Sequence, residues 1–207
     1  MKIFGIMGWK NSGKTGLMER LVAGLRAVGR LDGTVLIITS DHGEAFDDHG
    51  LFGHATGLLF EQVWVPLVLA GPGIPAGITV DQPVSLRDIA STVMERAQPP
   101  SGGGWPGASL SRCWDDDPGN DTATVFAEIA QRDSWNTELD VTHGDLHTII
   151  TREHQYLRSV RGQVRAECAD DTSDTTNIDT DPRHAWTRQA LSRVLDSMLT
   201  RSGRDPR

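Results

Sequence analysis

The amino-acid sequence predicts an α/β fold: a parallel or mixed sheet with flanking helices, followed by a carboxy-terminal β-hairpin and a closing helix. Two apolar runs, at residues 34–39 and 65–70, have the length of buried strands in such a sheet. Residues 182–199 carry one apolar stripe at helical spacing, which predicts an amphipathic helix. Strands and helices that alternate along a chain are typical of α/β domains.

Each predicted element rests on a local signal. The first helix follows from the spacing of Leu17, Leu21 and Leu25, and the second starts at Ser85, whose hydroxyl can cap the exposed amides. Residues 44–57 form a polar, glycine-spaced loop, and long loops in compact domains are usually functional or disordered. The predicted strands cover residues 3–7, 34–39, 65–70, 124–129, 147–151 and 155–160. The predicted helices cover residues 13–25, 85–97 and 182–199.

The charge distribution divides the chain into two regions. All three lysines lie within the first 14 residues, and the rest of the chain uses arginine alone. Such an asymmetry indicates two segments of different origin or task. We therefore predict a strand–loop–helix start at residues 1–30 and a main region at 31–207. Within the main region, residues 99–122 are rich in Pro, Gly and Asp and are expected to be a linker or surface loop.

A phosphate-binding pattern lies at the start of the chain. Residues 8–15 read GWKNSGKT and match G-x-x-x-x-G-K-[ST] between a predicted strand and a predicted helix. Glycines in this motif let backbone amides surround a phosphate, Lys14 supplies positive charge, and Thr15 can hold Mg²⁺. Residues 1–26 resemble the molybdopterin-guanine dinucleotide biosynthesis adaptor protein, a P-loop family. The resemblance implies GTP or ATP bound by Gly8, Gly13, Lys14 and Thr15.

The residues that follow do not continue a nucleotide-binding domain, because the P-loop resemblance ends after one strand and one helix. The motif counts as a nucleotide site only within its full structural context. The alternative is a fused start that keeps the P-loop sequence without its domain.

A candidate metal site lies where the predicted strand at residues 34–39 ends. Asp41 and His42 follow this strand, and open α/β sheets bind ligands at the carboxyl ends of their strands. Hard divalent cations prefer carboxylate oxygen. Asp41 and His42 are therefore the candidate ligands.

The wider pattern adds a family. Residues 40–44 read SDHGE, residues 48–51 read DHGL, and Gly53-His54, Glu61 and Val65-Pro66-Leu67 follow. In order and spacing this series resembles the sulfatases of the alkaline-phosphatase-like superfamily, and the resemblance extends over residues 33–199. It implies Ca²⁺ or Mg²⁺ at Asp41 and His42 and a small-molecule sulfate ester as substrate. It also implies a position for His54 facing the transferred sulfate or phosphate group, where its imidazole can donate a proton to the leaving oxygen, since histidine ordinarily titrates close to neutral pH.

One part of the sulfatase pattern does not occur in this sequence. Sulfatases carry a C/S-x-P-S/A-x-R segment near their start, whose cysteine or serine becomes formylglycine, whereas Cys113 and Cys168 are followed by Trp-Asp and Ala-Asp. Without this nucleophile the covalent step is lost. We therefore predict an incomplete sulfatase-like hydrolase of sulfate or phosphate esters, inactive as an isolated chain. The alternatives are a P-loop nucleotide-binding module related to molybdenum cofactor biosynthesis and a non-catalytic metal-binding interaction protein.

Composition limits the partners. A net charge of −8 argues against nucleic acid, because binding phosphates needs a basic surface. No run approaches the ~20 apolar residues of a membrane span, and the first residues lack a small-residue cleavage site, so we expect a cytoplasmic protein without membrane contact. The sequence leaves the oligomeric state open.

Overall fold

The computed structural model describes residues 13–48, 50–54, 56–97, 105–114, 124–131, 133, 140–159, 164–168, 178 and 181–203. The predicted strand at residues 3–7 and Gly8 of the phosphate-binding pattern lie outside the described residues. No helix in the described part is long and apolar enough to cross a bilayer.

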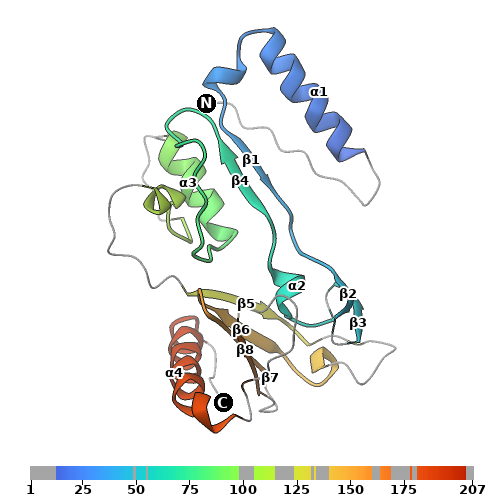
Figure 1. Ribbon diagram of the computed structural model, residues 1–207, viewed down its shortest axis with the longest axis vertical. Coiled ribbons are helices and arrows are strands. Elements are labelled where there is room, and N and C mark those ends of the chain that lie inside the picture. Colours follow the sequence, from blue (N-terminus) through green and yellow to red (C-terminus); the bar gives the residue numbers. More distant parts are fainter. Residues whose placement is uncertain are drawn as a thin grey trace.

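Helices and strands alternate through the first half, and the second half is a sheet closed by a helix, so the predicted α/β class is confirmed (Figure 1). The helices are α1 (Lys14–Ala27), α2 (Phe60–Val63), α3 (Arg87–Ala97) and α4 (Ala185–Arg201), with short 3-10 turns η1 (Leu31–Gly33), η2 (Leu110–Cys113), η4 (Asp140–Thr142) and η5 (Pro182–His184). The strands are β1 (Leu36–Thr39), β2 (Ala45–Asp48), β3 (Leu51–Gly53), β4 (Leu67–Ala70), β5 (Val125–Ile129), β6 (Leu146–Ile150), β7 (His154–Ser159) and β8 (Val164–Cys168).

All described strand pairs are antiparallel, which corrects the expectation of a parallel arrangement around the first two apolar runs. β1 pairs with β4, with Leu36 opposite Ala70 and Thr39 opposite Leu67. Parallel neighbours need a crossover connection, usually a helix. The connection between β1 and β4 instead contains the β2–β3 hairpin and the single turn of α2, so the chain returns in the opposite direction.

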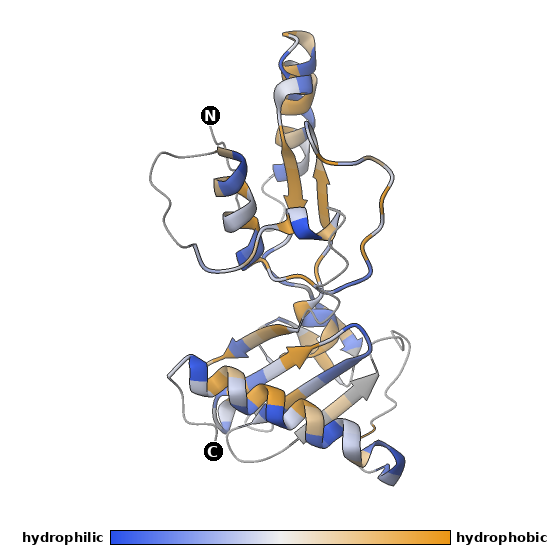
Figure 2. Ribbon diagram, turned by 90° about the vertical axis from the view of Figure 1, so that its left-hand side faces the viewer, coloured by the Kyte–Doolittle hydropathy of each residue, from blue (hydrophilic) through white to orange (hydrophobic). Residues whose placement is uncertain are grey.

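The largest sheet has the order β5-β6-β7-β8, and its β6–β7 pair confirms the predicted carboxy-terminal hairpin. Helix α4 crosses one face of this sheet (Figure 2). Its buried leucines, four residues apart, share a hydrophobic cluster with one residue from each of three neighbouring strands: Leu191, Leu195, Leu199, Ile149, Tyr156 and Ala166. The predicted closing helix thus completes a hydrophobic core.

The opposite face of the same sheet is covered by the segment before α2. Leu58 packs in a second cluster with Leu146 and Leu157. The buried amide of Gln155 on β7 donates a hydrogen bond of 2.6 Å to the carbonyl oxygen of Leu58. Because a buried carbonyl without a partner is costly, this bond fixes the chain leading into α2 against the sheet.

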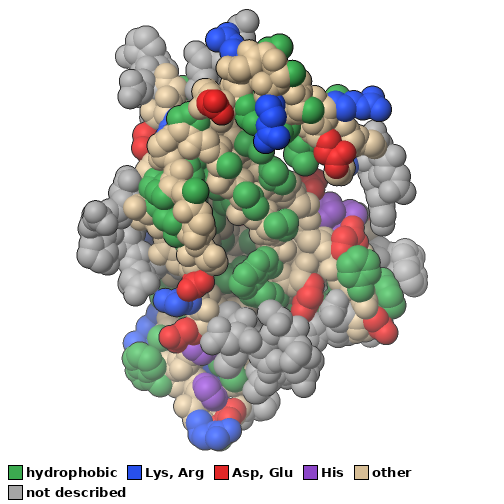
Figure 3. Space-filling model, turned by 45° about the horizontal axis from the view of Figure 1, so that its top comes forward, with side chains coloured by type: hydrophobic (Ala, Val, Ile, Leu, Met, Phe, Trp, Pro, Cys, Tyr) green, Lys and Arg blue, Asp and Glu red, His purple; other side chains and the backbone are tan. Residues whose placement is uncertain are grey.

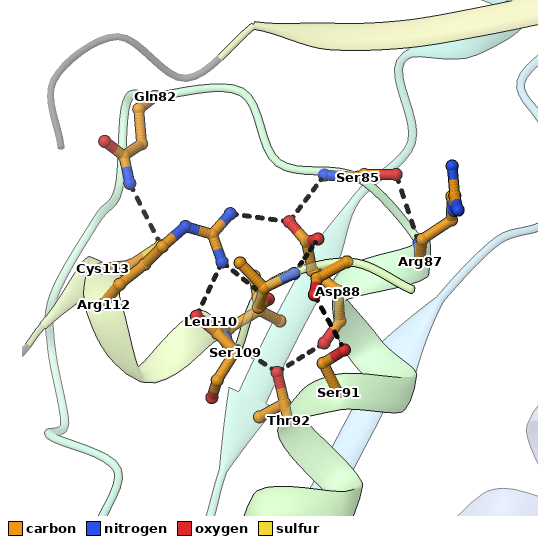
Figure 4. A network of polar contacts seen from close by, with 12 residues as sticks. Gln82, Ser85, Arg87, Asp88, Ser91, Thr92, Ser109, Leu110, Arg112 and Cys113 are labelled. Atoms are coloured by element: carbon orange, nitrogen blue, oxygen red, sulfur yellow. Dashed lines mark hydrogen bonds and ion pairs between the residues drawn. The ribbon is translucent and has the colours of Figure 1, made fainter. Parts of the chain in front are cut away.

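Helix α3 is joined to η2 by a polar network (Figure 4). Ser85 accepts a bond from the amide of Arg87, as a cap should, and its own amide donates to the buried carboxylate of Asp88. Arg112 lies 2.6 Å from that carboxylate, and the amide of Ala108 donates to its other oxygen. Residues 105–114, within the expected linker at 99–122, therefore pack against α3.

Candidate functional site

Asp41 and His42 lie directly after β1, as the sequence predicts, and the chain turns there against α2. The amide of Gly43 donates to the carbonyl oxygen of Gln62 over 2.9 Å. A Cβ atom at Gly43 would lie 2.0 Å from the carbonyl oxygen of Glu61, so only glycine permits this approach of two backbones.

The buried residue Gln62 holds both ends of the loop. Its carbonyl oxygen accepts the bond from Gly43, and its side-chain amide donates to the carbonyl of Gly53 at 3.2 Å and to the hydroxyl of Thr56 at 2.7 Å. His54 follows Gly53 directly. Gln62 is therefore a positioning residue that sequence reasoning missed, since no local pattern relates position 62 to positions 43 and 53.

The β2–β3 hairpin brings Glu44 and His54 together. Ala45 pairs with Gly53, so the residues just outside this pair, Glu44 and His54, meet at the open end of the hairpin. His54 Nδ1 lies 2.8 Å from Glu44 Oε1. Glu44 was expected only to shape the loop, and its contact with His54 depends on a strand pairing that the glycine-spaced sequence does not indicate.

His42 stacks on His54. The ring centroids are 3.9 Å apart, with 23° between the planes. His42 Nδ1 lies 2.9 Å from the carbonyl oxygen of Gly43. Ligand atoms of His42, Glu44 and His54 all lie within 4.8 Å of one another. The predicted residues His42 and His54 are thus brought together, and Glu44 joins them.

Asp41 stands beside this cluster with 87% of its side chain exposed, and one carboxylate oxygen is 3.8 Å from His42 Nε2. Its own backbone amide holds the pKa of Asp41 below the ordinary value, and the nearby His42 adds to this effect. Asp41 is therefore an ionised, accessible carboxylate at neutral pH.

A cavity of about 1220 Å³ opens beside these side chains. Asp41, His42 and His54 line part of its wall, as do Arg87 and Arg152. Most other lining residues are apolar and come from β4, β5 and residues 74–86. Figure 3 shows hydrophobic side chains around a hollow in this face, with histidines at its edge. The site can therefore receive a partly apolar, anionic molecule.

The phosphate-binding residues lie elsewhere. Gly13 is the N-cap of α1 in a left-handed conformation, with φ 81°, and Lys14 and Thr15 form the first turn. Figure 1 shows α1 at the top of the molecule, away from the β2–β3 hairpin. The structure therefore does not combine Gly13, Lys14 and Thr15 with the Asp41 cluster.

Part of this chain is similar to proteins of a known family. Residues 16–99 match the sulfatase family model. Arylsulfatase K of Danio rerio is 42% identical over 96 residues, which cover 46% of this chain and 18% of that protein. The structure of the phosphonate monoester hydrolase of Agrobacterium radiobacter superposes with a TM-score of 0.74 and 26% identity, over 91% of this chain and 39% of that one.

A putative sulfatase from Bacteroides thetaiotaomicron, 18% identical, shares the fold with a TM-score of 0.71, over 92% of this chain and 42% of that one. The chain thus spans less than half of each of these proteins. The family match starts before the expected boundary at residue 30, and it contains Asp41, His42 and His54. Residues 16–99 are therefore similar to the sulfatase family, and this match covers less than half of the chain.

Proposed function

We propose that this chain, with its sulfatase-family segment, supplies the metal loop and the substrate-facing histidine of a hydrolase of sulfate or phosphate esters, and that it does not turn over ester by itself. The observation that carries this proposal is the convergence of Asp41, His42 and His54 on one wall of a large, partly apolar cavity. Arg87 also lines this cavity and offers positive charge to an anionic group, whereas Arg152 lies 3.4 Å from Asp81 in the same lining.

Each side chain has a defined task in this proposal. His54, held by Glu44 at 2.8 Å, is positioned to give a proton to the leaving oxygen of the ester. The apolar residues of β4 and β5 bind the organic part of the substrate and exclude water. The nucleophile is outside this set, because the sequence contains no C/S-x-P-S/A-x-R segment.

The Ca²⁺ or Mg²⁺ that the resemblance implies does not fit the described residues on their own. Ca²⁺ takes about six to eight oxygen ligands, and Mg²⁺ requires near-octahedral oxygen coordination. Asp41 offers carboxylate oxygen, but its nearest titratable neighbour is the imidazole of His42 at 3.8 Å. No step of the proposed chemistry is therefore assigned to a hard cation.

A binding measurement tests the proposal. We expect an aryl sulfamate, which resembles an aryl sulfate but is not cleaved by simple hydrolysis, to bind the unmutated chain at least ~10-fold more tightly than the His54→Ala variant. His184→Ala, in η5, is the matched control and should bind like the unmutated chain. Equal binding by the His54→Ala variant would contradict the substrate-facing role. Hydrolysis of 4-nitrophenyl sulfate by the purified chain would contradict its incompleteness.

Nucleotide binding is a second candidate that one observation favours. Gly13, the N-cap of α1, is in the left-handed conformation that phosphate-binding loops use and makes no side-chain cap bond. If Gly8, Gly13, Lys14 and Thr15 bind GTP or ATP, a fluorescent GTP analogue binds the unmutated chain and not Lys14→Ala, whereas Arg26→Ala at the other end of α1 has no effect. An absence of binding by the unmutated chain would refute this candidate.

A further inference from the structure

The loop between β1 and α2 gathers nitrogen as well as oxygen donors. Its three clustered side chains, His42, Glu44 and His54, offer two imidazoles and one carboxylate within 4.8 Å of one another. We infer that these three residues form a site for a divalent cation of the zinc type, and that the chain binds this cation without another polypeptide.

The orientation of His42 is set before a cation arrives. Its Nδ1 lies 2.9 Å from the carbonyl oxygen of Gly43. Because a carbonyl oxygen only accepts, Nδ1 carries the proton and Nε2 keeps its lone pair. Histidine ligands of metals almost always donate their other ring nitrogen in this way. The accepting carbonyl belongs to Gly43, whose amide is itself bound to Gln62.

Glu44 and His54 form the other half of the site. The β2–β3 pairing fixes their backbones, and His54 Nδ1 and Glu44 Oε1 are 2.8 Å apart. Gln62 donates to the carbonyl of the preceding residue, Gly53, which limits the movement of His54. The three donors therefore come from backbone segments that are each anchored by hydrogen bonds, so little ordering is needed when a cation binds.

The chemistry of the donors decides which cation is bound. Imidazole suits Zn²⁺, Ni²⁺, Co²⁺ and Cu²⁺, whereas Ca²⁺ and Mg²⁺ select oxygen. Three protein ligands leave one position of a tetrahedral zinc site open, and His42 and His54 both line the cavity. Because two of the three ligands line the cavity, an anion bound there would be able to complete the coordination of the cation.

Metal titration tests the site directly and needs no ester turnover. With the cation bound, His54 is a ligand and gives no proton to an ester, so cation binding and the proposed proton transfer are alternative uses of this side chain. In calorimetry on the tag-free chain, we expect one Zn²⁺ to bind at least ~100-fold more tightly than Ca²⁺ or Mg²⁺. Co²⁺ should bind at the same site and give the visible absorption of a tetrahedral complex. Equal affinity for Ca²⁺ and Zn²⁺ would overturn the inference.

Single variants identify the ligands. We expect His54→Gln and Glu44→Gln each to weaken Zn²⁺ binding at least ~10-fold, and His184→Gln, in η5, to leave it unchanged. The Asp41→Asn variant distinguishes the inferred site from one formed by Asp41 and His42. If it abolishes Zn²⁺ binding while Glu44→Gln has no effect, then Asp41 and His42 hold the cation and the inference is wrong. Circular dichroism checks that each variant is folded. If His54→Gln does not fold, the near-isosteric Glu44→Gln variant provides the test.

Discussion

The four-stranded sheet of β5 to β8 and the two-stranded sheet of β1 and β4 contain similarly apolar strands, yet they are buried to different extents. All five residues of β6 are buried. No residue of β1 or β4 is buried, and Val68 of β4 is 53% exposed. The four-stranded sheet of β5–β8 has α4 on one face and the segment before α2 on the other. The comparison shows that apolar sequence indicates a capacity for burial, whereas the covering elements decide whether burial occurs.

The candidate site lies between these two regions. Asp41 and His42 follow β1 of the exposed sheet, and the next residue, Gly43, is bonded to α2. Leu58 lies just before α2, and its carbonyl oxygen accepts a hydrogen bond from Gln155 of the buried sheet. Local stability is expected to differ accordingly, because protected amides need many buried contacts around them. The site thus depends on the buried sheet for its anchoring.

The largest expected effect is in hydrogen exchange. Amides of β6 and β7 should exchange at least ~100-fold more slowly than amides of β1 and β4, because only the former open through unfolding of the main core. Native-state exchange followed by mass spectrometry or NMR measures both sheets in one sample. Similar protection of the two sheets would break the comparison.

Truncation of a core leucine should give the next largest effect. Leu195 of α4 is fully buried against the sheet, so Leu195→Ala is expected to lower the free energy of unfolding by about 2–5 kcal/mol. Val68→Ala in β4 should change it by about 0.5 kcal/mol or less. Urea denaturation of both variants measures the difference. A cost at Val68 equal to that at Leu195 would show that β4 is covered in solution.

Gln155→Ala tests the connection between the regions. The variant removes the donor to the carbonyl of Leu58 and the bond to Thr148, so the free energy of unfolding should fall by about 1–3 kcal/mol. We also expect faster hydrogen exchange of the Gly43 amide, because this amide is bonded to the carbonyl oxygen of Gln62 in α2. Gln131→Ala, an exposed glutamine beside the sheet, is the control. A change in stability without any change at Gly43 would separate the site from the buried sheet.

Acid sensitivity should give the smallest effect. Hydrogen bonds from Arg183 lower the pKa of Asp181 from 3.8 to about 2, so the ionised form favours the folded state. This contribution is present above pH 3.8 and is lost as the pH falls through about 2. The Tm difference between the unmutated chain and Asp181→Asn should therefore shrink over this interval. A difference that is constant with pH would show that Asp181 does not act through its charge.

Sequence reasoning located much of the fold, with boundaries shifted by a few residues. The strand expected at 65–70 is Leu67–Ala70, and the hairpin strand expected at 155–160 is His154–Ser159. The β2–β3 hairpin was missed, because its strands are short, its register is irregular at Phe46 and Asp48, and polar residues surround it. Strand direction was wrong for β1 and β4, since an apolar run does not indicate the direction of its neighbour.

For the site, the sequence singled out Asp41, His42 and His54, and in the structure all three line one cavity. Their roles as metal ligands and proton donor stay predictions. The ion-pairing role of Glu44 and the positioning role of Gln62 were not predictable. Both arise from contacts set by the hairpin and by α2. The boundary at residue 30 and the nucleotide-binding role of Lys14 stay predictions.

The close approach at Gly43 constrains how the loop can change during evolution. The atom that excludes a side chain at position 43 is the main-chain oxygen of Glu61, so replacing Glu61 by a smaller residue does not make room. Compensation requires a shift of the α2 backbone, which also carries the bonds of Gln62 to Gly43 and Gly53. Substitutions at position 43 are therefore accessible only after other changes have already rebuilt α2.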